Sequence, residues 1–147
     1  MNGRDRAYWV LALLIRLVIG VTFIMASYHK ILHPEAFAQS VYYYHMVPAS
    51  LLHLFALYLP WLELVAGVAL IIGCKAKGAA VLTALMTLAF IIGLSSALAR
   101  NLDISCGCFG TDAGHSVGMS LLIRDSIMFV ALGFFLWIER RKELLRA

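Results

Sequence analysis

Long apolar stretches alternate with short polar segments along the chain, and this pattern predicts its architecture. The apolar stretches cover residues 7–28, 49–73, 78–99 and 117–138. Each is long enough to cross a hydrocarbon core of roughly 30 Å, which takes about 20 helical residues. Because lipid offers the backbone no hydrogen-bond partners, we expect all four stretches to be helices. The prediction is an all-α, polytopic four-helix membrane bundle formed by one domain, residues 1–147.

An alternative interpretation of the first stretch is a signal peptide, since Arg4 and Arg6 precede it. Its apolar core is longer than the roughly 7–15 residues of a signal-peptide core, and no clear small-x-small cleavage site follows. We therefore expect this stretch to be a membrane span.

The polar segment between the first two spans, residues 33–48, predicts a short helix on the outer surface over residues 35–45. Pro34 suits a first helical turn, and the charge of Glu35 complements that end of the helix dipole. Three apolar side chains fall at helical spacing on one face: Phe37, Val41 and Tyr44. We expect this face to pack on the bundle and the helix to cover the second outer loop.

Composition supports a membrane environment. The chain is 63% hydrophobic and 14% charged, whereas soluble domains have about a quarter of their residues charged. We therefore expect the surface of this protein to contact membrane lipid. The net charge of +4 does not indicate nucleic-acid binding, because the basic residues cluster at the ends of apolar runs and no basic face is formed.

The distribution of Lys and Arg predicts the orientation. Only Lys30 and Arg100 flank the predicted outer segments, residues 29–48 and 100–117. The positive-inside rule then puts both termini in the cytoplasm, in a multi-pass inner-membrane protein. The opposite side carries eight basic residues: Arg4, Arg6, Lys75, Lys77, Arg140, Arg141, Lys142 and Arg146.

The motif CGCFG places Cys106 and Cys108 in the second outer, extracytoplasmic loop, whereas Cys74 lies at the cytoplasmic end of the second span. A disulfide between two cysteines separated only by Gly107 closes a small, strained ring. Strain makes a disulfide easier to reduce. The spacing therefore favours an exchanging, redox-active disulfide.

Two other interpretations of the cysteine pair stay open: a passive structural disulfide, and a two-thiolate site for a soft metal such as Cu(I) or Hg(II). Nearby positive charge favours the thiolate, the attacking species in exchange, and nearby carboxylates oppose it. The positive or chargeable groups near the pair are Arg100, His115 and Arg124, and the carboxylates are Asp103 and Asp112.

Four charged residues fall inside predicted spans: Arg16, Glu63, Arg124 and Asp125. A charge in lipid is costly, so we expect each to face the bundle interior. Arg16 and Glu63 lie at similar distances from the predicted inner ends of their spans, which predicts an ion pair between them. This pair could fix helix register, or the charges could line a site for a quinone head group or a proton path.

Several segments together resemble the DoxX-like membrane proteins, and their MauE branch in particular. The first span, RLVIGVTFIMASYHKIL, resembles the first helix of these proteins, and HPEAFAQSVYYYHMVP resembles the outer segment of the MauE branch. The segment PWLELVAGVALIIG is similar to its second helix, with Glu63 at the acidic position. The segments DISCGCFG and LLIRDSIMF are similar to its cysteine loop and fourth helix.

The resemblance implies a four-helix membrane protein linked to thiol redox chemistry. Family members in methylamine utilisation work beside a periplasmic thioredoxin-like protein during maturation of a disulfide-rich dehydrogenase subunit, and DoxX relatives are associated with quinone-linked oxidation. Our leading hypothesis is a membrane thiol–disulfide oxidoreductase in which Cys106 meets the thioredoxin-like partner and Cys108 faces the membrane. A quinone cofactor would lie among Arg16, Glu63 and Arg124. The rival hypotheses are a soft-metal binding or transport protein and a non-catalytic membrane assembly factor.

Overall fold

A computed structural model describes residues 3–43, 48–100 and 116–146 of the chain, and all its regular structure in these ranges is helical. The helices are α1 (Gly3–Leu32), α2 (Pro34–Tyr43), α3 (Ala49–Ile72), α4 (Ala76–Ala99) and α5 (Ser116–Arg146).

Four of these helices, α1, α3, α4 and α5, are long and apolar enough to cross a membrane. They correspond to the four predicted spans, so the prediction of a polytopic helical membrane protein is confirmed. The first and last helices extend further than expected, to Leu32 at the end of α1 and to Arg146 at the end of α5. The extension of α1 adds Lys30 to the helix.

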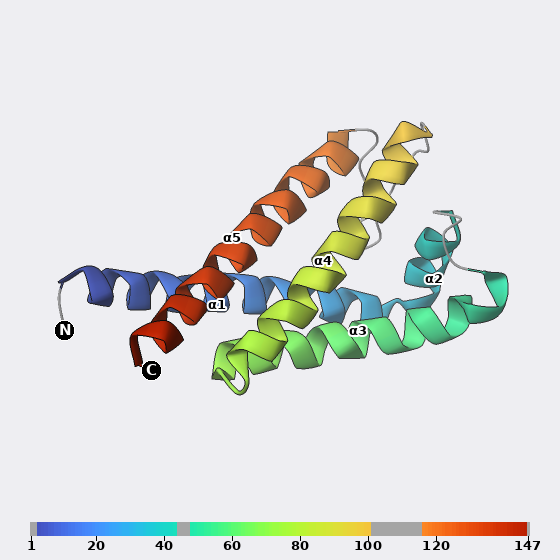
Figure 1. Ribbon diagram of the computed structural model, residues 1–147. Coiled ribbons are helices and arrows are strands. Elements are labelled where there is room, and N and C mark those ends of the chain that lie inside the picture. Colours follow the sequence, from blue (N-terminus) through green and yellow to red (C-terminus); the bar gives the residue numbers. More distant parts are fainter. Residues whose placement is uncertain (1–2, 44–47, 101–115, 147) are drawn as a thin grey trace.

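The helices form two pairs that cross at an angle (Figure 1). α1 packs most extensively against α3, and α4 packs against α5. Both termini lie toward the end of the molecule that carries the α3–α4 turn, and the two pairs diverge toward the other end (Figure 1). In the orientation predicted from the basic residues, the end with the α3–α4 turn is the inner end and the diverging end is the outer one.

Two glycines allow α1 and α3 to approach closely. A Cβ atom built on Gly20 would lie 2.9 Å from the carbonyl oxygen of Gly67, and a Cβ atom on Gly67 would lie 2.9 Å from the carbonyl oxygen of Gly20. Any larger side chain would force the backbones apart. Helices in lipid associate through such close packing, because lipid tails are as apolar as the side chains and the hydrophobic effect does not drive the helices together.

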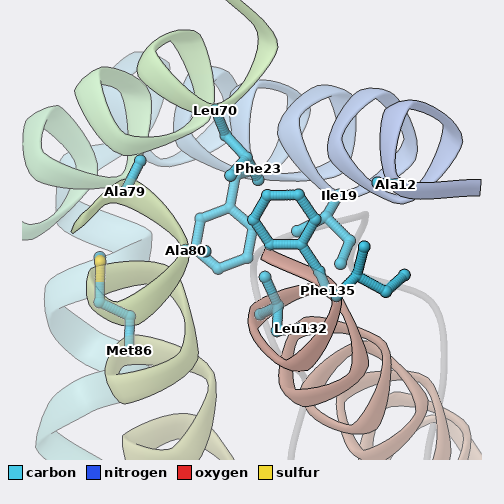
Figure 2. Close-up of a cluster of buried hydrophobic side chains, with 10 residues drawn as sticks. Ala12, Ile19, Phe23, Leu70, Ala79, Ala80, Met86, Leu132 and Phe135 are labelled. Carbon is cyan, nitrogen blue, oxygen red and sulfur yellow. The ribbon is translucent and has the colours of Figure 1, made fainter. Parts of the chain in front are cut away.

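The inner half of the bundle is filled by an apolar core to which all four spans contribute (Figure 2). Leu70, Leu132 and Phe135 are almost completely buried in it, and Ala80 lets α4 approach the centre closely. Other members of this cluster are Ala12, Ile19, Phe23, Ala79, Met86 and Ile138. The core explains why the pairs are held together at this end.

α2 is the short surface helix expected from the sequence, and it begins at the predicted proline. Phe37 and Val41 are buried and cluster with Ala56 of α3, so the predicted packing face is confirmed for these two residues. Tyr44, the third predicted member of the face, lies outside the described residues. So does the second outer loop, and the expectation that α2 covers it stays a prediction.

Candidate functional site

A buried ion pair joins α1 to α3 in the outer half of the bundle. The Nζ atom of Lys30 donates hydrogen bonds to both carboxylate oxygens of Glu63, with N–O distances of 2.6 Å and 2.8 Å. Lys30 is only 2% exposed and Glu63 only 1% exposed. Burying two charges in lipid is costly, and this close two-oxygen contact offsets the cost.

The direction of the Lys30 side chain explains how it reaches Glu63 from the end of α1. Side chains of a helix tilt toward its N-terminus, which here points Lys30 back toward the bilayer centre. Its ammonium group lies 4.4 Å from the ring centroid of Phe90 and 5.0 Å from that of Phe37. These cation–π contacts add attraction in a desolvated setting. Lys30 thus connects α1, α2, α3 and α4.

The ion pair forms part of the wall of a cavity of about 480 Å³ between the two helix pairs. All five helices contribute to the wall, which is mostly apolar. Small-molecule sites typically enclose about 300–1,000 Å³ and combine apolar walls with a few polar groups that orient the ligand. The polar side chains of this wall are Thr22, Lys30, Ser40, Glu63, Thr87, Arg124 and Asp125.

A second charged pair lies on α5, on the other side of the cavity. The guanidinium of Arg124 donates two hydrogen bonds to one oxygen of Asp125, at 3.0 Å and 2.8 Å. Asp125 is buried, and its carboxylate interacts electrostatically with that of Glu63. The cavity therefore has two carboxylates, each paired with its own cation.

The predicted ion pair between Arg16 and Glu63 is wrong. The guanidinium of Arg16 donates instead to the carbonyl oxygens of Leu70 and Ile71, at 2.8 Å and 3.1 Å. These carbonyls belong to the last turn of α3, where the helix itself supplies no donors and the dipole is negative. Arg16 therefore caps a helix end inside the membrane.

The turn that follows α3 is built around this contact. Gly73 has a φ of 84° and donates its N–H to the carbonyl oxygen of Ala69. A Cβ atom at Gly73 would lie 2.2 Å from Nη2 of Arg16. Glycine is thus required at this position both by its left-handed backbone and by the guanidinium.

Two features of the helices explain why Arg16 does not pair with Glu63. The prediction assumes that the first two spans begin at the same level in the membrane, but α1 extends inward to Gly3 while α3 ends at Ile72. In addition, Arg16 points toward the N-terminus of α1, and therefore away from Glu63. Both effects place its guanidinium at the end of α3.

Of the five predicted site residues, the structure describes Arg16, Glu63 and Arg124. Glu63 and Arg124 line the cavity, as a cofactor site would require, and Arg16 is engaged at the end of α3. Cys106 and Cys108 lie outside the described residues. Cys74 is exposed in the α3–α4 turn, away from the cavity.

Lys30 is the site residue that sequence reasoning missed, because it was counted only as a flanking charge of an outer segment. A signal was present in the spacing. Lys30 follows Ile19, Phe23 and Ser27 at helical spacing on the same face of α1, and the structure shows that all three are buried. A lysine in phase with a buried stripe indicates an interior partner.

The fold and this site together define a class: a polytopic membrane protein with a charged, small-molecule-sized cavity between its helices. A family model described as methylamine utilisation protein MauE matches residues 8–138. The chain therefore belongs to the MauE family. It is 29% identical to the methylamine utilization protein MauE of Paracoccus denitrificans over 115 residues, which is 78% of this chain and 62% of that protein. No solved structure was found to match the chain.

Proposed function

We propose that this protein is a membrane thiol–disulfide oxidoreductase. Cys106 and Cys108 exchange electrons with an extracytoplasmic thioredoxin-like protein on one side and with a quinone in the cavity on the other. The observation that carries the proposal is the cavity with its buried Lys30–Glu63 pair, set among the helices whose ends the cysteine loop joins.

The position of the cavity supports this coupling. Its wall includes Leu94, near the end of α4, and Leu121, near the start of α5. Residues 101–115, which contain both cysteines, join these two helix ends in sequence. A ligand in the cavity would thus lie next to the segments on which the cysteine loop is anchored.

The wall also fits a quinone head group. The volume of about 480 Å³ suits a substituted aromatic ring with part of an apolar tail. Phe37 and Phe90 offer ring faces, and Lys30 and Arg124 offer donors for carbonyl oxygens. A bound quinone would accept two electrons and two protons. Dithiol plus quinone would then give disulfide plus quinol, and the reverse reaction has the same balance.

The residues of the chain have distinct roles in this scheme. The ammonium group of Lys30 has three protons, and in the described part of the chain it donates only to Glu63. It can therefore also donate to a carbonyl oxygen in the cavity, while Glu63 holds it in place. In one direction, one cysteine thiolate of the chain attacks the partner's disulfide and the other cysteine resolves the mixed disulfide. In the reverse direction, a thiolate of the partner attacks the Cys106–Cys108 disulfide and the partner's second thiolate resolves the mixed disulfide, which leaves both cysteines of the chain as thiols.

The name of the P. denitrificans relative refers to methylamine utilisation. We propose that this protein also takes part in methylamine utilisation, to which it contributes thiol–disulfide exchange. Membership of the family and the cysteine motif support this assignment.

A single-turnover experiment tests the function. Purified protein is reduced, freed of reductant and mixed with decylubiquinone, and both thiols and quinol are counted. We expect two thiols lost and one quinol formed per chain, with no reaction in a Cys106→Ser/Cys108→Ser variant. Cys74→Ser is the matched control and should react like the wild type. Equal quinol formation by the double variant would reject the redox function, and a stoichiometric soft metal bound by the pair would favour the metal-site rival.

The orientation and the unequal roles of the cysteines have their own test. A membrane-impermeant thiol reagent should label Cys106 and Cys108 in reduced whole cells, and labelling only after the inner face is opened would contradict the orientation. A Cys108→Ser variant should trap a reductant-sensitive adduct with a thioredoxin-like protein through Cys106. An adduct trapped through Cys108 instead would reverse the two roles.

A further inference from the structure

We propose that the cavity receives its ligand sideways from the bilayer, through an opening between α3 and α4. The ligand is an amphiphile whose polar head contacts Lys30 and Glu63 and whose apolar tail leaves past Phe55 and Leu85. This inference deepens the proposed function, on which its choice of a quinone head rests, because it specifies a long-tailed, membrane-dissolved quinone.

The exposed residues of the cavity wall all belong to two neighbouring helices, α3 and α4. Phe55 is 42% exposed and Leu85 is 60% exposed, and Ala89 is exposed as well. These residues belong to α3 and α4, and Leu85 and Ala89 lie one turn apart on one face of α4. The wall residues from α1, α2 and α5 are buried or half-buried. The cavity therefore reaches the surface between α3 and α4.

This opening faces lipid in a membrane-embedded protein. Phe55 lies within the span Ser50–Ile72, and Leu85 and Ala89 lie within the span Ala76–Ala99. The side chains at the opening are all apolar, whereas Lys30 and Glu63 of the same wall are almost fully buried. An apolar mouth and a charged interior match a molecule with an apolar tail and a polar head.

Within the described residues, α3 and α4 separate at the opening and the backbone of α2 does not pack across it. α3 and α4 diverge outward from their shared turn, as Figure 1 shows. In the ranges that the structure describes, no backbone contact joins α2 to α4 or α3 to α5. The backbone of the surface helix thus packs on α1 and α3 and not on α4.

The test compares two ligands that differ only in their tails. Binding of a radiolabelled ubiquinone with a long isoprenoid tail, and of the tail-less ring ubiquinone-0, is measured in nanodiscs with the oxidised protein. Ala89→Trp narrows the opening, and Leu85→Trp is a second variant that does the same. Val81→Trp is the matched control, because Val81 is 46% exposed on the same face of α4 but does not line the cavity.

We expect Ala89→Trp and Leu85→Trp to weaken binding of the long-tailed quinone by about tenfold. Binding of ubiquinone-0 should stay within about twofold, and Val81→Trp should change neither. Equal behaviour of all three variants, or equal weakening of both ligands, would overturn the lateral opening.

A long-chain alkylphenol, measured in the same series beside its short-chain counterpart, separates this inference from the proposed function. A tail-dependent loss of alkylphenol binding, with no quinone bound even by the wild type, would keep the opening and reject the quinone. Tail-independent binding of every ligand would reject the opening, whatever the outcome of the redox experiment.

Discussion

Two cations of α1, the half-buried Arg16 and the buried Lys30, lie in different surroundings at the two ends of the bundle. At the inner end, Arg16 is bound by backbone carbonyls at the end of α3, next to a tightly packed apolar core. At the outer end, Lys30 is bound by Glu63 at the wall of a cavity. The cavity wall includes Lys30 and Glu63 but not Arg16.

The surroundings of a charge inside the membrane thus indicate whether its role is structural or functional. A charge such as Arg16, which donates hydrogen bonds to the end of a helix, has a complete structural role without any ligand. A buried ion pair at the wall of a cavity is not needed for stability, because apolar residues of similar size often replace buried ion pairs without loss of stability. Such a pair therefore indicates a functional role. We therefore assign the inner half of the bundle to assembly and the outer half to ligand binding.

The largest effect is expected at the outer ion pair. Lys30→Met should lower the free energy of unfolding by about 3–5 kcal/mol, because it leaves the buried carboxylate of Glu63 without its cation. The double variant Lys30→Met/Glu63→Leu should recover most of this loss. Unfolding in mixtures of SDS and mild detergent measures both.

The surface pair of Glu139 and Lys142, at 2.8 Å and half-buried, is the control for this experiment. Lys142→Met should cost about 0.5 kcal/mol or less. Equal costs for Lys30→Met and Lys142→Met would show that the outer pair is not held in a desolvated site.

An intermediate effect is expected at Arg16. Replacing it with Met removes the donors from two carbonyl oxygens of α3, at a total cost of about 1–3 kcal/mol, because the site is only half-buried. Arg16→Lys should retain part of the stability, because an ammonium group cannot reproduce the fork of the guanidinium. The same unfolding assay applies, and a stability unchanged by Arg16→Met would contradict the capping role.

The smallest effect is expected at the helix contact. Gly20→Ala places a Cβ atom 2.5 Å from Cγ1 of Ile71 and 2.9 Å from the carbonyl oxygen of Gly67. We expect a loss of about 1–3 kcal/mol from the overpacking. Gly133→Ala is the control: no atom lies within 4 Å of its added Cβ, and alanine should stabilise the helix by about 0.5–1 kcal/mol. A gain in both variants would show that α1 and α3 can separate freely.

The fold could be predicted well from the sequence because lipid imposes a simple constraint. A span must be helical and about 20 residues long, so hydropathy alone located α1, α3, α4 and α5. The start of α2 was visible in Pro34 and Glu35. What hydropathy cannot give is the vertical offset between neighbouring helices, and the inward extension of α1 was for this reason not expected.

The site could be predicted only in part. Glu63 and Arg124 were identified as interior charges because charges in spans are costly, and both line the cavity. Lys30 was missed because its position near a helix end is equally compatible with a side chain that turns out to the interface. Its actual direction depends on the carboxylate of α3 and on the rings of Phe37 and Phe90, which only the tertiary structure brings together.

The most direct test of the central claim is quinone binding by variants that alter one end of the bundle at a time. Affinity for long-tailed ubiquinone is measured in nanodiscs for the wild type, for Lys30→Met/Glu63→Leu and for Arg16→Met, each checked for a folded helical state. We expect the outer double variant to lose about tenfold or more in affinity, whereas Arg16→Met should stay within about twofold of the wild type. Full affinity in the outer variant, or an equal loss in Arg16→Met, would contradict the assignment of ligand binding to the outer half.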